Sequence, residues 1–483
     1  MQNKKKSEEG LTIKKEENFS EWYQQLIIKS ELADYTDVSG CIVFRPGSFQ
    51  VWEKIKEECD KRFKKLGIKN CYFPLFIPEK AFKKEQEHVE GFIPEVAWVT
   101  QAGNTKLNEK LAIRPTSEAI MYESFSKWIR SWRDLPLKYN QWNNVVRWEF
   151  NNPVPFFRTR EFLWNEGHSV FASEKESLKE ASKIKKVYEE VVEEFMALPG
   201  IYGRKTEKEK FAGAVFSEKI HYILPNGRVI EGPCFHHDGQ NFAKAYKIKF
   251  SDENGKEEYC WQNTYAISTR MLGTMFAIHS DNKGVIIPPK LAENKVVIIP
   301  ILFDKIKDRI IKEAEKLKKI LKEFNPILDD REEYSPGWKY SEWELKGIPL
   351  RIEIGPRELE GKQLIIVKRN NGKKSIIQTK DAKKEIKKIL YEMQKELYEN
   401  AKKMMNSNIE KTEDKKKLLE FIKSKKVVMV PLCSSAKCEE ILKEDTGGAK
   451  VLFIDPEKTS VNGVKCIICK KPANYWVYVG KTY

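Results

Sequence analysis

The sequence of 483 residues has no long hydrophobic segment, and this absence excludes several classes of protein. No apolar run approaches the roughly 18 to 20 residues that a membrane-spanning helix requires. The N-terminal stretch MQNKKKSEEGLTIKKEEN is charged and contains no hydrophobic segment of the signal-peptide type. We therefore expect a cytoplasmic protein that does not associate with a membrane. Residues 1–18 are expected to form a charged, flexible tail.

Cysteine is scarce, and its distribution is uneven. Five of the nine cysteines are scattered along the chain, which is typical of a reduced intracellular protein. The other four form two close pairs, Cys433 with Cys438 and Cys466 with Cys469. Four thiols in two such pairs suit tetrahedral Zn²⁺, so the sequence predicts a structural zinc site. Reduced thiols without a metal are the alternative.

Acidic residues are fewer than basic ones, with 71 Asp and Glu against 87 Lys and Arg, which gives a net charge of +16. This excess favours a polyanionic partner such as RNA, although a lysine-rich proteome would produce the same excess. At this length the chain exceeds a single core, and typical domain sizes predict about three domains.

Charged and aromatic residues are interleaved between Val146 and His168, in VRWEFNNPVPFFRTREFLWNEGH. The alternation predicts two antiparallel strands joined by a loop. Arginine presents a planar fork of donors that matches phosphate, so this pattern indicates a polyphosphate site. A salt-bridged surface hairpin is the alternative, but solvated faces seldom carry so many aromatic rings.

This hairpin resembles motif 2 of the class II aminoacyl-tRNA synthetases. The segment RTREFLWNEGH, together with RPTSE at 114–118 and KTEKEKFAG at 205–213, is similar to prolyl-tRNA synthetases of the archaeal and eukaryotic type. The resemblance extends from about Phe19 to Tyr483, with the motifs in the order of the family. Between the motif 2 and motif 3 arginines there is no room for the inserted editing domain of the bacterial type.

Patterning and resemblance together predict three domains. Strands dominate residues 19–290, which indicates an α+β catalytic domain built on an antiparallel sheet. A βαβ alternation follows at 295–400 and predicts an α/β domain, which resembles the anticodon-binding domain of class II synthetases. Residues 401–483 are expected to form a small α+β domain of zinc-binding type.

A helix is predicted between Ser48, as its N-cap, and Gly67, as its C-terminal stop. Together with the strand that follows, it resembles motif 1, whose role in the family is the homodimer interface. Ordinary packing of a helix on a sheet is the alternative interpretation.

The resemblance implies an ATP site in which Arg147 contacts the α-phosphate and the attacking carboxylate, and Arg270 contacts the γ-phosphate. Taken alone, Arg270 would be read as an exposed helix residue. The carboxylates of Glu149 and Glu231 are the candidates for Mg²⁺, which takes one or two of them. The full ATP-binding set is Arg147, Glu149, Arg158, Thr159, Glu231, Cys234 and Arg270. The family often has Gln at the position of Glu231 and a small hydroxyl residue at that of Cys234.

A pocket for proline requires apolar walls and one anion, because the substrate is a small ring with a secondary ammonium. The resemblance assigns Thr116 and Glu118 to the imino group. The full proline-binding set is Thr116, Glu118, Arg147, Phe162, Trp164, Glu166, His168, Phe211 and His236. In relatives the terminal tyrosine, here Tyr483, reaches back toward this site.

In the second domain the resemblance assigns Glu344, Arg351 and Lys373 to the two guanines of a proline anticodon. Arginine and glutamate suit the edges of guanine in a single-stranded loop. The alternative is an exposed, charged strand face, which the alternation between Pro349 and Gly355 also fits.

The implied function is that of a homodimeric proline–tRNA ligase. It would activate L-proline with ATP to prolyl-adenylate and transfer the prolyl group to the 3′ end of tRNA(Pro), releasing AMP and pyrophosphate. Two other interpretations remain: a class II ligase for another amino acid, and a synthetase-like protein that binds RNA as a regulator without catalysis. The motif arginines Arg147, Arg158 and Arg270 are all present, which disfavours the second.

Overall fold

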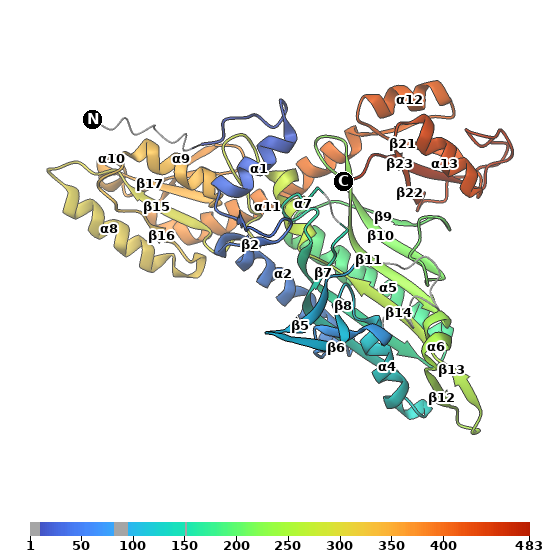
Figure 1. The fold of residues 1–483 in the computed structure, drawn as a ribbon. Helices are drawn as coiled ribbons and strands as arrows, with labels where there is room; N and C mark the ends of the chain where they lie inside the picture. The colour runs from blue at the N-terminus through green and yellow to red at the C-terminus, as the bar shows by residue number, and fades with distance from the viewer. Residues whose placement is uncertain (1–9, 82–94, 150–151) are drawn as a thin grey trace.

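The computed structural model describes residues 10–81, 95–149 and 152–483, which fold into three domains (Figure 1). The first domain, which the sequence predicts to be the catalytic domain, is built on seven strands in the order β9-β10-β11-β14-β8-β7-β3. Neighbours are antiparallel, except for the parallel pair β3 and β7. The strands are β3 Lys69–Asn70, β7 Leu137–Val146, β8 Glu161–Phe171, β9 Ile201–Arg204, β10 Phe216–Ile223, β11 Val229–Gly239 and β14 Trp261–Ala266.

The predicted charged hairpin is confirmed by β7 and β8, which pair antiparallel from Leu137 opposite Val170 to Val146 opposite Glu161. The loop between them begins at Arg147, whose backbone N–H donates to the carbonyl of Arg160 at 2.8 Å. Most of the motif 2 charges therefore lie at the loop end of the hairpin, beyond the last residue pair of β7 and β8.

Helices pack against this sheet and enclose the largest core. The longest of them, α2 (Pro46–Lys65), buries Trp52, Ile55 and Phe63. It ends before Gly67, whose φ of +77° fits the predicted stop. The remaining helices of the domain are α1 Phe19–Lys29, α4 Glu118–Trp128, α5 Glu174–Glu190 with the π-helical turn Val191–Phe195, α6 Asn241–Tyr246 and α7 Arg270–His279.

The predicted N-cap of α2 is wrong, because the helix begins one turn earlier. Pro46 occupies its first turn and Arg45 precedes it without a side-chain cap. The hydroxyl of Ser48 instead donates to the carbonyl of Leu32 at 2.5 Å, inside the core.

Three smaller sheets complete the domain: β1 (Ala33–Tyr35) with β2 (Ile42–Phe44), β4 (Phe76–Pro78) with β6 (Thr105–Ile113) and β5 (Trp98–Ala102), and β12 (Lys249–Ser251) with β13 (Glu257–Tyr259).

The segment 10–18 is docked on the catalytic domain. Leu11 and Ile13 pack against its core, and the ammonium of Lys15 donates to the carbonyl of Ser280 at 2.8 Å. Burial lowers the pKa of Lys15 to about 8. The flexible tail predicted at 1–18 is therefore wrong for residues 10–18, and residues 1–9 lie outside the described part.

The second domain is a five-stranded mixed sheet in the order β16-β15-β17-β18-β19, covered by helices. Its central strand β17 (Leu350–Ile354) is buried at every position, including Arg351 and Glu353. The exposed strand face that the alternation suggested is therefore wrong. The other elements are β15 Val296–Pro300, α8 Lys307–Ile320, β16 Ile327–Leu328, α9 Pro336–Lys346, α10 Pro356–Glu360, β18 Gln363–Lys368, β19 Lys374–Gln378 and α11 Ala382–Ser407.

The C-terminal domain extends the catalytic sheet. Its strands follow the order β20-β21-β23-β22, and Ile454 of β22 pairs with Arg204 of β9, so one sheet of eleven strands runs through both domains. Helix α11 continues past the boundary predicted at residue 400. The strands are β20 Ile409–Lys411, β21 Val427–Leu432, β22 Lys450–Ile454 and β23 Tyr475–Gly480, with helices α12 Lys415–Lys423 and α13 Ala436–Asp445. Among the described residues, no helix has both the length and the apolar character needed to cross a bilayer.

Candidate active site

A cavity of about 660 Å³ lies on the catalytic sheet, where the β7–β8 loop, β11, β14 and the start of α7 meet. Every predicted ATP-binding and proline-binding residue except Arg158 lines it: Thr116, Glu118, Arg147, Glu149, Thr159, Phe162, Trp164, Glu166, His168, Phe211, Glu231, Cys234, His236 and Arg270. Arg158 lines an adjoining cavity of about 190 Å³ together with Tyr483. Both cavities include Glu231 and Arg270, so the two spaces share a wall.

Two arginines are held in this cavity by neutral groups. Nε of Arg147 donates to the carbonyl of Pro115 at 3.1 Å, and Nε of Arg270 donates to that of Phe157 at 3.1 Å. Within the described residues, neither guanidinium forms an ion pair. The charge of Arg147 lies 5.2 Å from the centre of the Trp164 ring. Positive charge without an anionic partner suits the binding of phosphate or carboxylate.

Glu166 is saturated with donors. It accepts hydrogen bonds from the backbone N–H of Ser117 at 2.9 Å and from the amide of Asn143 at 2.7 Å. The hydroxyl of Ser117 donates to it as well, at 2.5 Å, and the hydroxyl oxygen of Thr116 lies 3.1 Å from it. This carboxylate therefore organises the floor of the cavity rather than offering a free charge.

Glu118 has fewer donors. The hydroxyl of Thr116 donates to its carboxylate, and only 6% of the residue is exposed. Burial raises the pKa of Glu118, and the charge of Glu166 acts in the same direction. An ammonium group placed here would restore the ionised form, so Glu118 is the better candidate of the two for a cationic ligand.

Aromatic rings and histidines form the walls. Phe162 and Trp164 meet edge to face at 5.5 Å, and Phe211 packs on His236 at 5.0 Å. Nδ1 of His236 is 2.7 Å from the hydroxyl of Ser217. Burial lowers the pKa of His236 to about 3, so this ring is neutral at pH 7. The ring of His168 is fixed in the same manner, with Nδ1 3.2 Å from the hydroxyl of Tyr122.

Sequence reasoning missed two lysines that neutralise Glu231. Lys205 lies 2.5 Å and Lys219 2.7 Å from its carboxylate. Burial alone would raise the pKa of Glu231, but Lys219 and Lys205 hold it well below its ordinary range. Lys205 belongs to the KTEKEKFAG motif, whereas nothing in the sequence distinguishes Lys219 from other lysines of this basic chain. Glu149, the other predicted Mg²⁺ ligand, is exposed and has no partner among the described residues.

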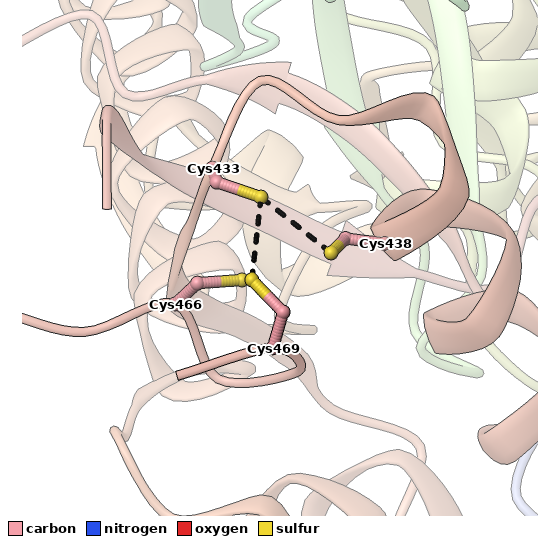
Figure 2. Close-up of side chains that lie close together, drawn as sticks. All are labelled: Cys433, Cys438, Cys466 and Cys469. Carbon is pink, nitrogen blue, oxygen red and sulfur yellow. Dashed lines mark hydrogen bonds between the residues drawn. The ribbon is translucent and has the colours of Figure 1, made fainter. Parts of the chain in front are cut away.

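The four paired cysteines converge in the C-terminal domain (Figure 2). Their sulfur atoms all lie within 4.8 Å of one another, with Cys433 3.5 Å from Cys438 and 3.7 Å from Cys469. A tetrahedral Zn²⁺ with bonds of about 2.3 Å to sulfur would separate the sulfurs by about 3.8 Å. The backbone N–H of Lys471 lowers the pKa of Cys469 to about 7, which favours the thiolate that a metal requires. The donor set therefore fits a structural metal site.

The structure brings together two of the three predicted anticodon residues. Nη1 of Arg351 lies 3.0 Å from Glu344, and Nη2 of the same guanidinium lies 3.0 Å from Glu353. The central carbon of this guanidinium, Cζ, lies 4.0 Å from the centre of the Tyr340 ring. Lys373 is exposed in the turn between β18 and β19 and forms no hydrogen bond to either residue in the described part of the chain.

An antiparallel sheet with an arginine-lined cavity beside the loop of its β7–β8 hairpin is the arrangement that the resemblance to class II aminoacyl-tRNA synthetases predicts. In agreement, residues 98–279 match the family described as tRNA synthetase class II core domain (G, H, P, S and T), and residues 295–389 match the anticodon binding domain. Residues 416–483 match the family described as prolyl-tRNA synthetase, C-terminal.

Whole-chain relatives narrow the assignment. The cytoplasmic proline–tRNA ligase of Arabidopsis thaliana is 43% identical over 99% of this chain and 92% of its own length. The proline–tRNA ligase of Alkaliphilus oremlandii is 42% identical, over 97% of each chain. A crystal structure of prolyl-tRNA synthetase from Cryptosporidium parvum, complexed with halofuginone and AMPPNP, superposes with a TM-score of 0.95 at 41% identity and covers 99% of this chain and all of its own. The chain belongs to the prolyl-tRNA synthetase family.

Proposed function

We propose that this chain condenses L-proline with ATP to form prolyl-adenylate and pyrophosphate, and then transfers the prolyl group to the 3′ end of tRNA(Pro), releasing AMP. The observation that carries the proposal is a cavity that combines a buried carboxylate at Glu118, aromatic walls and two arginines that form no ion pair with the described residues. These are the groups that an amino acid carboxylate, a triphosphate and a cyclic secondary ammonium require.

The first step brings two anions together, because the carboxylate of proline attacks the α-phosphate of ATP. The main requirement is compensation of negative charge and positioning of both reactants. Arg147 begins the motif 2 loop and lies beside Trp164 of the proline wall, which supports a contact of its guanidinium with both the carboxylate and the α-phosphate. Arg158, Thr159 and Arg270 hold the remainder of the nucleotide.

The nucleotide would bring Mg²⁺, which neutralises phosphate charge. Glu149 is the better supported of the two predicted ligands, because its carboxylate is exposed at the cavity and without a partner among the described residues. Glu231 is already neutralised by Lys205 and Lys219. Its role is then to hold these lysines at the nucleotide end of the cavity, with Cys234 beside it.

Proline fits the opposite end of the cavity. The carboxylate of Glu118 and the hydroxyl of Thr116 receive the imino group, while Glu166 fixes Thr116 in place. The ring is enclosed by Phe162, Trp164 and Phe211, with His168 and the neutral His236 as a polar rim.

Recognition of tRNA is assigned to the second domain. Glu344 and Arg351 present a guanidinium and a carboxylate side by side, as a guanine edge requires, and the exposed Lys373 is available to phosphate or base. A base that binds Arg351 has to replace part of its interaction with Glu344.

A homodimer and a structural zinc ion complete the proposal for a cytoplasmic enzyme. Exposed apolar side chains gather near the β1–β2 hairpin and the start of α2, namely Tyr35, Val38, Val43 and Phe49, which supports an interface there. Sedimentation of the purified protein tests the dimer. Metal analysis of the purified protein tests the zinc site. We expect one equivalent of zinc in the wild type and its loss in Cys466→Ser.

The decisive experiment for the activity is ATP–pyrophosphate exchange with each of the twenty amino acids, followed by charging of tRNA(Pro). We expect exchange that depends on proline, and charging of this tRNA. Exchange with a different amino acid would favour another class II ligase. The absence of exchange with all twenty would favour an RNA-binding regulator.

A further inference from the structure

The loop at 205–213, which connects β9 to β10, forms one wall of the cavity. Five of its consecutive residues line the space: Lys208, Glu209, Lys210, Phe211 and Ala212. Phe211 contributes the ring that packs on His236. Whatever fixes this loop therefore fixes the width of the pocket at the proline end.

The C-terminal domain anchors the start of this loop. The hydroxyl of Thr206 donates to the carboxylate of Glu439, in the first turn of α13, at 3.0 Å. Both residues are buried, with exposed fractions of 2% and 5%. The ammonium of Lys205 donates to the carbonyl of Leu452 in β22 at 2.8 Å. Two side-chain contacts thus fasten consecutive loop residues to a different domain.

Backbone hydrogen bonds connect Thr206 to the part of the loop that forms the pocket wall. Its carbonyl accepts from the N–H of Glu209 at 3.2 Å and of Lys210 at 3.0 Å, which forms the turn that precedes Phe211. The N–H of Phe211 in turn donates to the hydroxyl of Ser217 at 2.9 Å, and that hydroxyl contacts His236. A shift of Thr206 therefore displaces the turn that places Phe211.

We propose that Glu439 is a positioning residue for the proline pocket, because its hydrogen bond to Thr206 holds the 205–213 loop against His236. Glu439 does not line the cavity, so it acts only through Thr206. It directly follows Cys438, so the cysteine cluster and the pocket wall are attached to the same turn of α13. This inference rests on the proposed activity and adds a role for the C-terminal domain in substrate binding.

The test is to measure the kinetics of ATP–pyrophosphate exchange for Glu439→Ala, Glu439→Gln and a control, Glu444→Ala. The control removes an exposed carboxylate from the same helix. For Glu439→Ala we expect the KM for proline to rise about tenfold, the effect of losing one buried hydrogen bond. The KM for ATP and kcat should stay within about twofold, since the hydrogen bonds of Arg147 and Arg270 to the described residues do not involve this loop. Glu439→Gln keeps an acceptor for Thr206 and should restore the wild-type KM, as should the control.

Thr206→Val provides a second route, since it deletes the hydroxyl at nearly constant shape. It should raise the KM for proline as Glu439→Ala does, and the double variant should be no worse than either single one. Hydrogen exchange of the amides of 205–213 supplies a readout that does not depend on activity, and it should accelerate in both single variants.

The inference would be overturned if folded Glu439→Ala and Thr206→Val had the same KM for proline as the wild type. It would also be overturned if the amides of 205–213 exchanged hydrogen at the wild-type rate in both variants. An equal rise in the KM values for proline and ATP would also overturn it, because it would indicate a general loss of structure. A wild-type protein without proline-dependent exchange would instead contradict the proposed activity, and the amide measurement would still decide the loop contact.

Discussion

The catalytic cavity and the anticodon-binding domain both contain arginines on or beside central strands, but the two sets have different partners. Arg147 and Arg270 donate to backbone carbonyls, which leaves their charge available to a ligand. Arg351 lies in the buried strand β17 and is paired with two carboxylates, Glu353 of the same strand and Glu344 of α9. The half-buried Arg147 and Arg270 are therefore poised for an anion, whereas the partners of the buried Arg351 indicate a group that also stabilises the fold.

The largest effect that this comparison predicts concerns Arg270. Arg270→Ala should lower kcat/KM for proline-dependent pyrophosphate exchange by about a thousandfold, the scale expected for removal of a preorganised charge from a transition state. Arg270→Lys should recover little of this loss, because a lysine cannot reproduce the planar fork. Exchange within tenfold of wild type for the alanine variant would contradict the proposed role of the Arg270 guanidinium in activation.

Arg351→Ala should act mainly on stability. The change deprives the buried Glu353 of its nearer cation, and removal of one partner of a buried ion pair typically costs about 3 to 5 kcal/mol. Because Glu353 retains Lys374 at 3.7 Å, we expect a value near the lower end of that range, measured as the shift of the second domain's transition in urea. Charging of tRNA(Pro) should also fall. A variant as stable as wild type would indicate that the Glu344–Arg351 pair contributes little to this fold.

Glu231 tests an intermediate case, a paired carboxylate that lines the cavity. Glu231→Gln leaves Lys205 and Lys219 without their anion and should lower stability by about 1 to 2 kcal/mol at pH 7. Exchange should remain within about threefold, because the amide oxygen still accepts from one of the two lysines. The depressed pKa of Glu231 means that its contribution is present above the unfolded pKa of about 4.3 and is lost as pH falls through the folded value. The difference in thermal midpoint between wild type and variant should therefore shrink in acid, and a constant difference would contradict this account.

The smallest effect concerns Asp238, a fully buried acid in β11. Burial raises its pKa well above the ordinary value, with a further contribution from Glu118. The folded protein thus retains a proton that the unfolded chain releases, so stability falls as pH rises from about 4 toward the folded pKa. Asp238→Asn should remove this slope, so its thermal midpoint relative to wild type should increase between pH 4.5 and 7. A relative midpoint that declines over this range would contradict the raised pKa.

Local patterns in the sequence predicted the elements that carry the site. Alternation gave the β7–β8 hairpin, and helical spacing gave α2 up to Gly67. Ser48 was misassigned because Pro46 allows the helix to begin earlier. The alternation of charges in β17 was misleading, because ion pairs satisfy Arg351 and Glu353 within a buried strand.

Contacts between segments that are distant in the sequence could not be predicted from such local patterns. The pairing of Ile454 with Arg204 joins segments about 250 residues apart and merges two sheets that patterning treats separately. Lys219 likewise resembles any other lysine of this basic chain until β10 places it against Glu231. The motif residues were predictable because they lie in short, dense segments, whereas their supporting residues come from other parts of the fold.

The most direct test of the central claim is to measure proline-dependent pyrophosphate exchange in Arg147→Ala and Arg351→Ala side by side, at a temperature at which both remain folded. The account predicts a loss of about a hundredfold or more for Arg147→Ala and near wild-type exchange for Arg351→Ala. Equal losses in the two folded variants, or retention of exchange by Arg147→Ala, would contradict it.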